Sequence, residues 1–156
     1  MASEPRSNLG DRITFSPADR EHFDELAELR IAAMRESLER VGRFTPERAR
    51  QRLQNSFYPE HTRFILLDGA KVGFYTFRPE QEEFRLEHLY IHPSHQSRGV
   101  GSHVLAKLLE EADALRKPVF LGALRESASN RFYQRHGFEP IREDEWDIYY
   151  MRPTQK

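Results

Sequence analysis

The first third of the chain carries apolar residues at every third or fourth position, the period of a helix with one buried face. Ser16-Pro17-Ala18-Asp19 combines a capping serine, a proline at the first helical position and an acid, so it predicts a helix start. The apolar face of this long helix would consist of Phe23, Leu26, Ala27, Ile31, Met34, Leu38 and Val41. Thr45-Pro46 predicts a second, shorter helix through Ala49 and Leu53.

Short apolar segments with an alternating pattern predict strands. These segments are 12–15, 64–67, 72–77, 84–91, 118–121 and 146–151. Asp68-Gly69 tolerates positive φ angles and predicts a hairpin turn between the second and third strands. Helical spacing returns over 101–115 and 127–136, and Gly137 is expected to end the last helix in the left-handed conformation.

This order of elements predicts an α+β fold with one mixed central sheet of about six to seven strands, flanked by about four helices. No repeat, low-complexity tract or long linker divides the chain, so we expect a single domain over residues 12–152. Residues 1–11 are polar and contain Pro5 and Gly10, which favours a disordered lead-in.

The composition narrows the function classes. Lysine and arginine total 24 and aspartate and glutamate 25, so no overall charge would draw the protein to nucleic acid or to a membrane surface. The absence of cysteine excludes a disulfide framework, a thiol nucleophile and cysteine-ligated metal, and fits a cytoplasmic location. No apolar run reaches the roughly 18 residues that span a membrane.

The strongest candidate for chemistry follows the strand over 84–91. The chain passes through Gln96-Ser97-Arg98-Gly99-Val100-Gly101 directly into a helix, whose first backbone N–H groups could bind a phosphate. Gly99 and Gly101 would let the phosphate approach the backbone, and Arg98 adds charge. The sequence fits neither a Walker loop nor a dinucleotide-binding loop, because the lysine and the third glycine are missing. From spacing alone, an ordinary glycine-containing turn remains an equal alternative.

Two signatures decide between these interpretations. Leu89-Tyr90-Ile91-His92-Pro93, followed by Gln96-x-x-Gly99-x-Gly101, resembles the acetyl-CoA motif of the GNAT superfamily of N-acetyltransferases. Downstream, the segment from Asn130-Arg131-Phe132-Tyr133 to Gly137-Phe138 is similar to the second signature of that superfamily. The resemblance covers about residues 12–152, although the N-terminal helices match only in pattern, and it implies an acyl-CoA-dependent N-acyltransferase domain.

The resemblance also implies roles for individual residues. The backbone of Leu89, Tyr90 and Ile91 would pair with the pantetheine arm of acetyl-CoA, and backbone donors near Tyr90 would polarise the thioester. The pyrophosphate would lie in the loop formed by Gln96, Ser97, Arg98, Gly99, Val100, Gly101 and Ser102. Tyr133 would be the general acid that protonates the departing thiolate. Many relatives have asparagine seven residues before this tyrosine, where Glu126 stands here, so Asn130 either contacts the pantetheine arm or supports its own helix.

The base that accepts the proton of the amine is less well defined by the sequence. Glu87 is the first candidate, because it lies on the strand that leads to the cofactor loop, with its neighbour His88 on the opposite face. Glu87 could equally be a paired surface acid, and Glu83 and His88 are weaker alternatives. Position 85, where some protein-modifying relatives have a base, is arginine.

The sequence therefore predicts transfer of an acetyl or acyl group from acetyl-CoA to a primary amine by direct attack through a tetrahedral intermediate, since no cysteine is present to form a thioester with the enzyme. A CoA-binding regulatory module without activity is the alternative. His88, His92 and His95 have unsuitable spacing for a metal site, so no metal is expected. The aromatic C-terminal strands make a homodimer an expectation by analogy, and the acceptor stays open.

Overall fold

The structure is a computed structural model that describes residues 9–42 and 44–155. It is built around one sheet of seven strands in the order β1-β2-β3-β4-β5-β7-β6. Their bounds are Ile13–Pro17 (β1), Thr62–Leu67 (β2), Ala70–Pro79 (β3), Phe84–Ile91 (β4), Val119–Leu124 (β5), Glu139–Glu143 (β6) and Asp147–Arg152 (β7). The α+β fold and the mixed sheet predicted from the sequence are confirmed.

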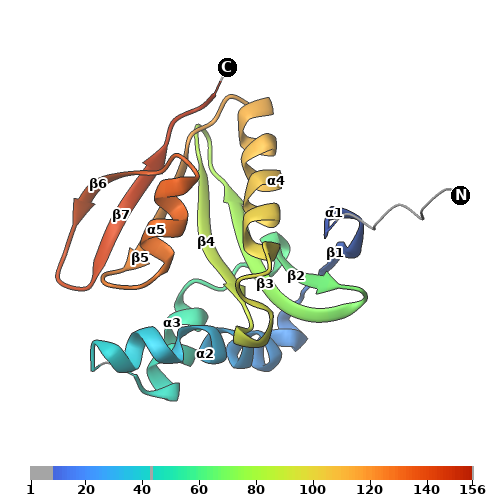
Figure 1. Ribbon diagram of the computed structural model, residues 1–156, viewed down its shortest axis with the longest axis vertical. Helices are drawn as coiled ribbons and strands as arrows, with labels where there is room; N and C mark the ends of the chain where they lie inside the picture. The colour runs from blue at the N-terminus through green and yellow to red at the C-terminus, as the bar shows by residue number, and fades with distance from the viewer. Residues whose placement is uncertain (1–8, 43, 156) are drawn as a thin grey trace, which may run out of the picture.

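The sheet divides between β4 and β5, which form its one parallel pair. These strands are paired at two positions, Phe84 with Val119 and Arg85 with Phe120. Beyond them the strands separate, so that the sheet opens like a V toward the helices at its lower end (Figure 1). Most of β4 therefore has a strand neighbour on the β3 side alone, and its other edge borders the opening.

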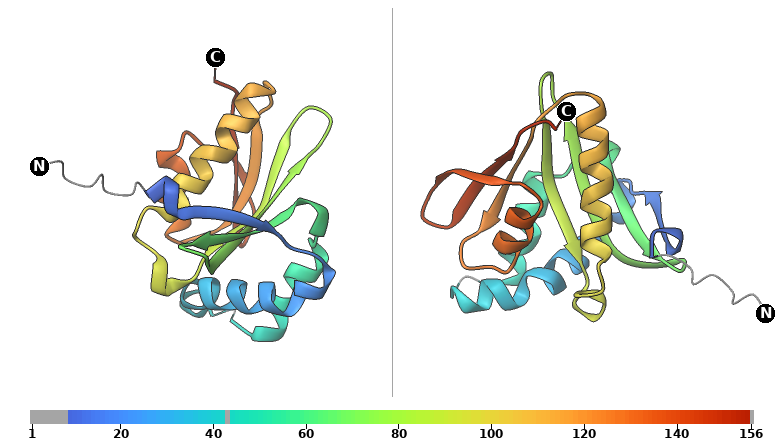
Figure 2. Two further views of the ribbon diagram at one scale, coloured as in Figure 1. Left: turned by 90° about the vertical axis from the view of Figure 1, so that its right-hand side faces the viewer. Right: turned by 45° about the horizontal axis from the view of Figure 1, so that its top comes forward.

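Helices cover both faces of the sheet. The helices α2 (Phe23–Arg40) and α3 (Pro46–Asn55) lie across the sheet from α4 (Val100–Ala114), as the side view shows (Figure 2). The short helix α5 (Ser129–Arg135) lies beside β5, next to the opening (Figure 1). Within the described ranges, no helix is long and apolar enough to cross a membrane.

Each face has its own apolar core. On one side α4 packs its buried residues, among them Val104, Leu105 and Leu108, against β3, β4 and β5. On the other side Leu26 and Ala27 of α2 pack against Phe64 and Phe74 of the sheet. A side chain of β4 therefore packs either with α4 or with α2, depending on the face of the sheet to which it points. The direction of each side chain also decides whether it reaches the opening.

A β-bulge in the middle of β4 changes the face of the sheet to which its side chains point. Thr76 of β3 pairs with His88 and Phe77 pairs with Leu86, so Glu87 is the extra residue. As a result Leu86 and Leu89, three residues apart, both pack on the α4 side, whereas His88 and Tyr90 contact the α2 side through Phe74. Bulges commonly redirect side chains beside functional sites.

Two expectations about local structure need correction. Residues 9–11 of the expected lead-in are helical, because α1 (Leu9–Arg12) packs Leu9 against the α4-side core; residues 1–8 lie outside the described part. Ser16-Pro17 does not start the long helix, since it pairs with β2 at the end of β1. The cap is Asp19, whose side chain accepts the N–H of Glu21 before a short 3-10 turn, Arg20–His22, that leads into α2.

The sequence also missed one strand. The sequence pattern predicted no strand between the helix over 127–136 and the strand over 146–151, but residues 139–143 pair with β7 as the edge strand β6. Every residue of β6 is exposed, so its sequence lacks the apolar alternation by which a strand is recognised. The remaining predicted elements are present, and Gly137 ends α5 with φ +90° as expected.

Candidate functional site

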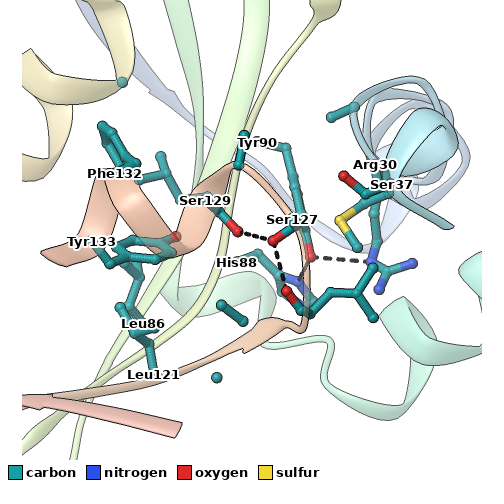
Figure 3. Close-up of a pocket in the computed structure, with 18 of the residues that line it drawn as sticks. Arg30, Ser37, Leu86, His88, Tyr90, Leu121, Ser127, Ser129, Phe132 and Tyr133 are labelled. Carbon is teal, nitrogen blue, oxygen red and sulfur yellow. Dashed lines mark hydrogen bonds between the residues drawn. The ribbon is translucent and has the colours of Figure 1, made fainter. Parts of the chain in front are cut away.

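A cleft of about 1520 Å³ occupies the opening between β4 and β5. It is lined by these two strands, by the loop before α4 and the start of that helix, by α5, and by α2 and α3. Figure 3 shows Phe132 and Tyr133 on one side, Arg30 and Ser37 on the other, and Tyr90 between them. The divergence of two parallel strands thus creates a cavity that reaches both helical layers.

The loop before α4 ends in unpaired backbone donors. Ser97 and Gly99 have φ angles of +64° and +83°, and Gly99 precedes the helix without a side-chain cap. The first hydrogen bond within the helix runs from the N–H of His103 to the carbonyl oxygen of Gly99, at 3.0 Å. Among the described residues, the N–H groups of Val100, Gly101 and Ser102 consequently have no hydrogen-bond partner at the positive end of the helix dipole, a general feature of anion sites.

Most of the predicted cofactor-binding residues line this cleft. They are Leu89, Tyr90, Ile91, Gln96, Ser97, Gly99, Val100, Gly101 and Ser102. The side-chain amide of Gln96 donates to the carbonyl oxygen of Ile91 at 2.8 Å and so ties the loop to the end of β4. Arg98 is exposed and is not part of the lining.

Tyr133 lies in the wall of the cleft, opposite Arg30 (Figure 3). Its side chain is 8% exposed and packs edge-on against Phe132 and Phe138. Burial raises the pKa of its hydroxyl well above the ordinary value, and the nearby Tyr90 raises it further. The hydroxyl makes no hydrogen bond to the residues that the structure describes, so the phenol stays protonated and free to donate.

Asn130 has a structural role. Its amide donates to the carbonyl oxygens of Leu124 and Ser127, at 2.8 and 3.0 Å. Its oxygen accepts the hydroxyl hydrogen of Tyr150 at 2.7 Å. Asn130 is absent from the lining of the cleft and joins α5 to β5 and β7. Of the two roles open for Asn130, this geometry favours support of its own helix.

Glu87 lines the cleft at the bulge of β4. Its carboxylate accepts a hydrogen bond from Arg78 of β3 at 2.9 Å. The alternatives to Glu87 differ in position: Glu83 is not part of the lining and pairs with Arg85, whereas His88 is buried within the wall. Glu87 is therefore an ion-paired acid, as one interpretation of the sequence expected, and it also faces the cleft, as a base for the amine would have to.

A buried hydrogen-bonded chain in the wall of the cleft escaped the sequence analysis. Arg30 donates from Nε to the phenolic oxygen of Tyr90 at 3.2 Å, and this oxygen lies 3.1 Å from Nδ1 of His88. Nε2 of His88 lies 2.9 Å from the hydroxyl and 3.2 Å from the carbonyl oxygen of Ser56. One sequence signal indicated that Arg30 is buried: it follows Leu26 by four residues and Ala27 by three, and so lies on the buried face of α2.

The chain fixes the protonation of its histidine. The Ser56 hydroxyl already donates to the carbonyl oxygen of Arg52, so both Ser56 oxygens accept from His88 Nε2. Nε2 therefore carries the hydrogen, and Nδ1 accepts the hydroxyl hydrogen of Tyr90. Burial, together with the positive charge of Arg30, lowers the pKa of His88 to about 3. His88 is thus neutral near pH 7 and a poor proton acceptor.

The histidines do not form a metal cluster. His88 points into the α2 side, whereas Nδ1 of His92 accepts a hydrogen bond from the N–H of Ser94. Among residues 9–42 and 44–155, no group of three metal-ligating side chains is arranged to hold an ion.

Comparison with known proteins gives the family. Residues 59–140 match the model described as "Acetyltransferase (GNAT) domain". No curated protein is similar enough to this chain to count as a match.

Solved structures share the fold at low sequence identity. PaiA N-acetyltransferase from Thermoplasma acidophilum, in complex with coenzyme A, superposes with a TM-score of 0.73 at 15% identity, over 90% of this chain and 98% of that one. An acetyltransferase from Thermus thermophilus superposes with a TM-score of 0.70 at 21% identity, over 90% of this chain and 96% of that one. The ribosomal-protein-S18-alanine N-acetyltransferase from Escherichia coli superposes with a TM-score of 0.68 at 16% identity, over 92% of this chain and 95% of that one. With a family model that matches more than half of its length and a fold shared with these enzymes, the chain belongs to the GNAT family of acetyltransferases.

Proposed function

We propose that this protein transfers an acetyl group from acetyl-CoA to a primary amine by direct attack of the amine on the thioester. The observation that carries the proposal is the juxtaposition, in one cleft, of the free N–H groups at the start of α4, the open edge of β4 and the buried hydroxyl of Tyr133. Membership of the GNAT family supports acyl transfer in general.

The cleft fits the cofactor in two respects. The N–H groups of Val100, Gly101 and Ser102 are suited to the pyrophosphate, and a Cβ on Gly101 would point toward Phe132, in the wall of the cleft. The edge of β4 from Leu89 to Ile91 has no strand partner on the β5 side, so an extended pantetheine arm can add there as a strand does. Coenzyme A is bound in the Thermoplasma relative, which supports the same donor here.

Acetyl-CoA supplies an activated acyl group. The amine nitrogen forms the new bond to the carbonyl carbon, the carbon–sulfur bond breaks, and the sulfur leaves with its electron pair. Tyr133 is suited to stabilise and protonate that sulfur, because burial keeps its hydroxyl protonated and no described residue competes for its hydrogen.

The amine must lose a proton during the attack. We assign this step to Glu87, directly or through a water molecule, because its carboxylate lines the cleft whereas neutral, buried His88 is a poor acceptor. Replacement of Glu87 by Gln should lower turnover, with unchanged affinity for acetyl-CoA. Glu83→Gln is the matched control on the same hairpin. Unaltered turnover in Glu87→Gln would exclude this assignment.

The decisive experiment combines two measurements. Isothermal titration with acetyl-CoA measures binding, and release of free thiol over a panel of amines measures transfer. Binding together with amine-dependent thiol release supports the proposal. Binding without turnover on any amine would indicate the alternative, a CoA-binding module without activity, and absence of binding would exclude both.

A further inference from the structure

Among the residues that the structure describes, none supplies an anionic partner for the buried cation of Arg30. It is 6% exposed, yet it lines the cleft. Its guanidinium contacts neutral groups: the phenolic oxygen of Tyr90, the carbonyl oxygen of Ala49 at 2.9 Å, and the face of the Tyr90 ring. A guanidinium has five N–H donors, and these hydrogen bonds use two of them. Burying such a charge is costly unless an anion accompanies it.

The other charges of the cleft do not supply that anion. Eight arginines line it: Arg30, Arg40, Arg48, Arg52, Arg85, Arg131, Arg135 and Arg142. The lining contains three carboxylates, Glu36, Glu87 and Asp147, and each forms an ion pair with another arginine: Arg40, Arg78 and Arg52, respectively. The chain as a whole is nearly neutral, so this excess of positive charge is specific to the cleft.

The position of Arg30 separates it from the proposed cofactor site. The start of α4 and Tyr133 belong to one side of the cleft, whereas Arg30, on α2, lies on the other, beyond Tyr90 (Figure 3). Arg131 and Arg135 of α5 are on the cofactor side, where the phosphates of coenzyme A would need charge. Arg30, together with Arg48 of α3, remains for the acceptor.

We infer that the acceptor of this enzyme is a small amine that also carries a carboxylate, and that this carboxylate binds the guanidinium of Arg30. The inference rests on the proposed N-acyltransferase function. Planar guanidinium and carboxylate groups form two parallel charge-assisted hydrogen bonds, for which Arg30 retains unused donors on its Nη atoms. The hydrogen bonds to Tyr90 and Ala49 hold the guanidinium in place, so that the carboxylate would position the amine.

The substrate-side test uses the unmodified protein. Thiol release is measured for glycine, β-alanine, γ-aminobutyrate and L-glutamate, each beside the corresponding carboxamide, and for 1,4-diaminobutane. Acid and amide share the same amine and differ in charge. We expect kcat/KM for the best acid to exceed that for its amide by about 100-fold, the scale of a lost partner in a buried charged pair. The diamine should be the poorest acceptor, because arginines line the cleft.

The enzyme-side test compares Arg30→Gln and Arg30→Lys with Arg50→Gln. Arg30→Gln should remove most of the preference for acid over amide, and Arg30→Lys should restore part of it. Arg50, on α3, pairs with Asp24 and does not line the cleft, so Arg50→Gln should leave the preference unchanged. Affinity for acetyl-CoA shows that each variant is folded, and a purely structural role of Arg30 would lower turnover of acid and amide equally.

The outcomes separate the two proposals. Equal or better turnover of amides and diamine would overturn the carboxylate inference and leave N-acyl transfer intact. If no acid is a substrate, and none binds to the CoA complex in calorimetry, the carboxylate inference is wrong whatever else is acetylated. If the Arg30 variants do not fold, the comparison of acid with amide in the unmodified protein still decides.

Discussion

The phenolic oxygen of Tyr90 lies 3.1 Å from Nδ1 of His88, and this hydrogen bond joins the wall of the cleft to a histidine that is neutral near pH 7. Tyr90 also accepts from Arg30, so a single hydroxyl connects an uncompensated cation with a neutral ring. The arrangement makes His88 a structural residue that positions Tyr90, and it has a measurable consequence for stability.

His88 should make the protein sensitive to acid. Its pKa is about 3 in the folded protein and about 6.5 in an unfolded chain. Between these values the unfolded chain binds more protons, so the stabilisation is complete above about pH 6.5 and is lost as the pH falls toward 3. We expect His88→Gln to flatten the fall of the unfolding free energy in this window by up to about 1.4 kcal/mol per pH unit.

Denaturant unfolding at a series of pH values measures that slope. The control is His61→Gln, since the ring of His61 forms no hydrogen bond or ion pair with the described residues. His61→Gln should keep the slope of the parent protein. The same slope in His88→Gln would contradict a neutral, buried His88.

Tyr133→Phe should separate binding from turnover. The change removes a hydroxyl that makes no hydrogen bond to any described residue, so acetyl-CoA affinity and stability should stay close to those of the parent. The rate constant kcat should fall about 100-fold, the scale of a lost proton donor. Tyr75→Phe is the control, because Tyr75 is also buried but lies outside the cleft. Equal kcat values for Tyr133→Phe and the parent would exclude the acid role.

Gly101 provides a test of the anion site. A Cβ at this position meets Phe132 at 3.5 Å, an ordinary contact, so Gly101→Ala should fold and bind acetyl-CoA within a few-fold of the parent. Gly101→Glu places a negative charge beside the free N–H groups of α4, where it would compete with the pyrophosphate. Calorimetry should show that Gly101→Glu loses affinity for acetyl-CoA by at least about 100-fold. Retained affinity would mean that the pyrophosphate binds elsewhere.

The ion pair between Asp113 and Arg152 should stabilise the C-terminal strand. Arg152 of β7 is 8% exposed and donates to both carboxylate oxygens of Asp113, at 2.8 and 3.1 Å. Asp113→Asn leaves this guanidinium buried without its anion, and we expect a loss of about 2 to 3 kcal/mol in thermal or denaturant unfolding. Glu36→Gln, which breaks an exposed pair with Arg40, should cost less than about 0.5 kcal/mol.

The pH dependence of this pair has a defined sign. The hydrogen bonds from Arg152 lower the pKa of Asp113 below its ordinary value of 3.8. Its contribution is therefore complete above about pH 4 and is lost as the pH falls through the lowered pKa. Asp113→Asn should differ from the parent most at neutral pH and converge with it in acid; a constant difference would contradict the ion pair.

Local patterns predicted most elements, because period and turn chemistry act over a few residues. Asp68-Gly69 has the positive φ angles of the predicted turn, and Thr45 caps α3 as expected. The start of α2 was misplaced because Ser16 and Asp19 are both good caps, and the choice between them was made by the pairing of β1 with β2. The exposed β6 carried no signal, since its strand conformation depends on its neighbour β7.

The sequence by itself determined that Gly99 and Gly101 follow a strand and open a helix, because a loop of this kind is made by contiguous backbone. Its second motif also singled out Tyr133, which lines the cleft. The tertiary structure alone decided what faces that loop. The divergence of β4 from β5 and the bulge at Glu87 bring Tyr90 within reach of Arg30, sixty residues earlier in the chain. Such a contact depends on strand pairing and helix packing over long distances, which no local spacing encodes.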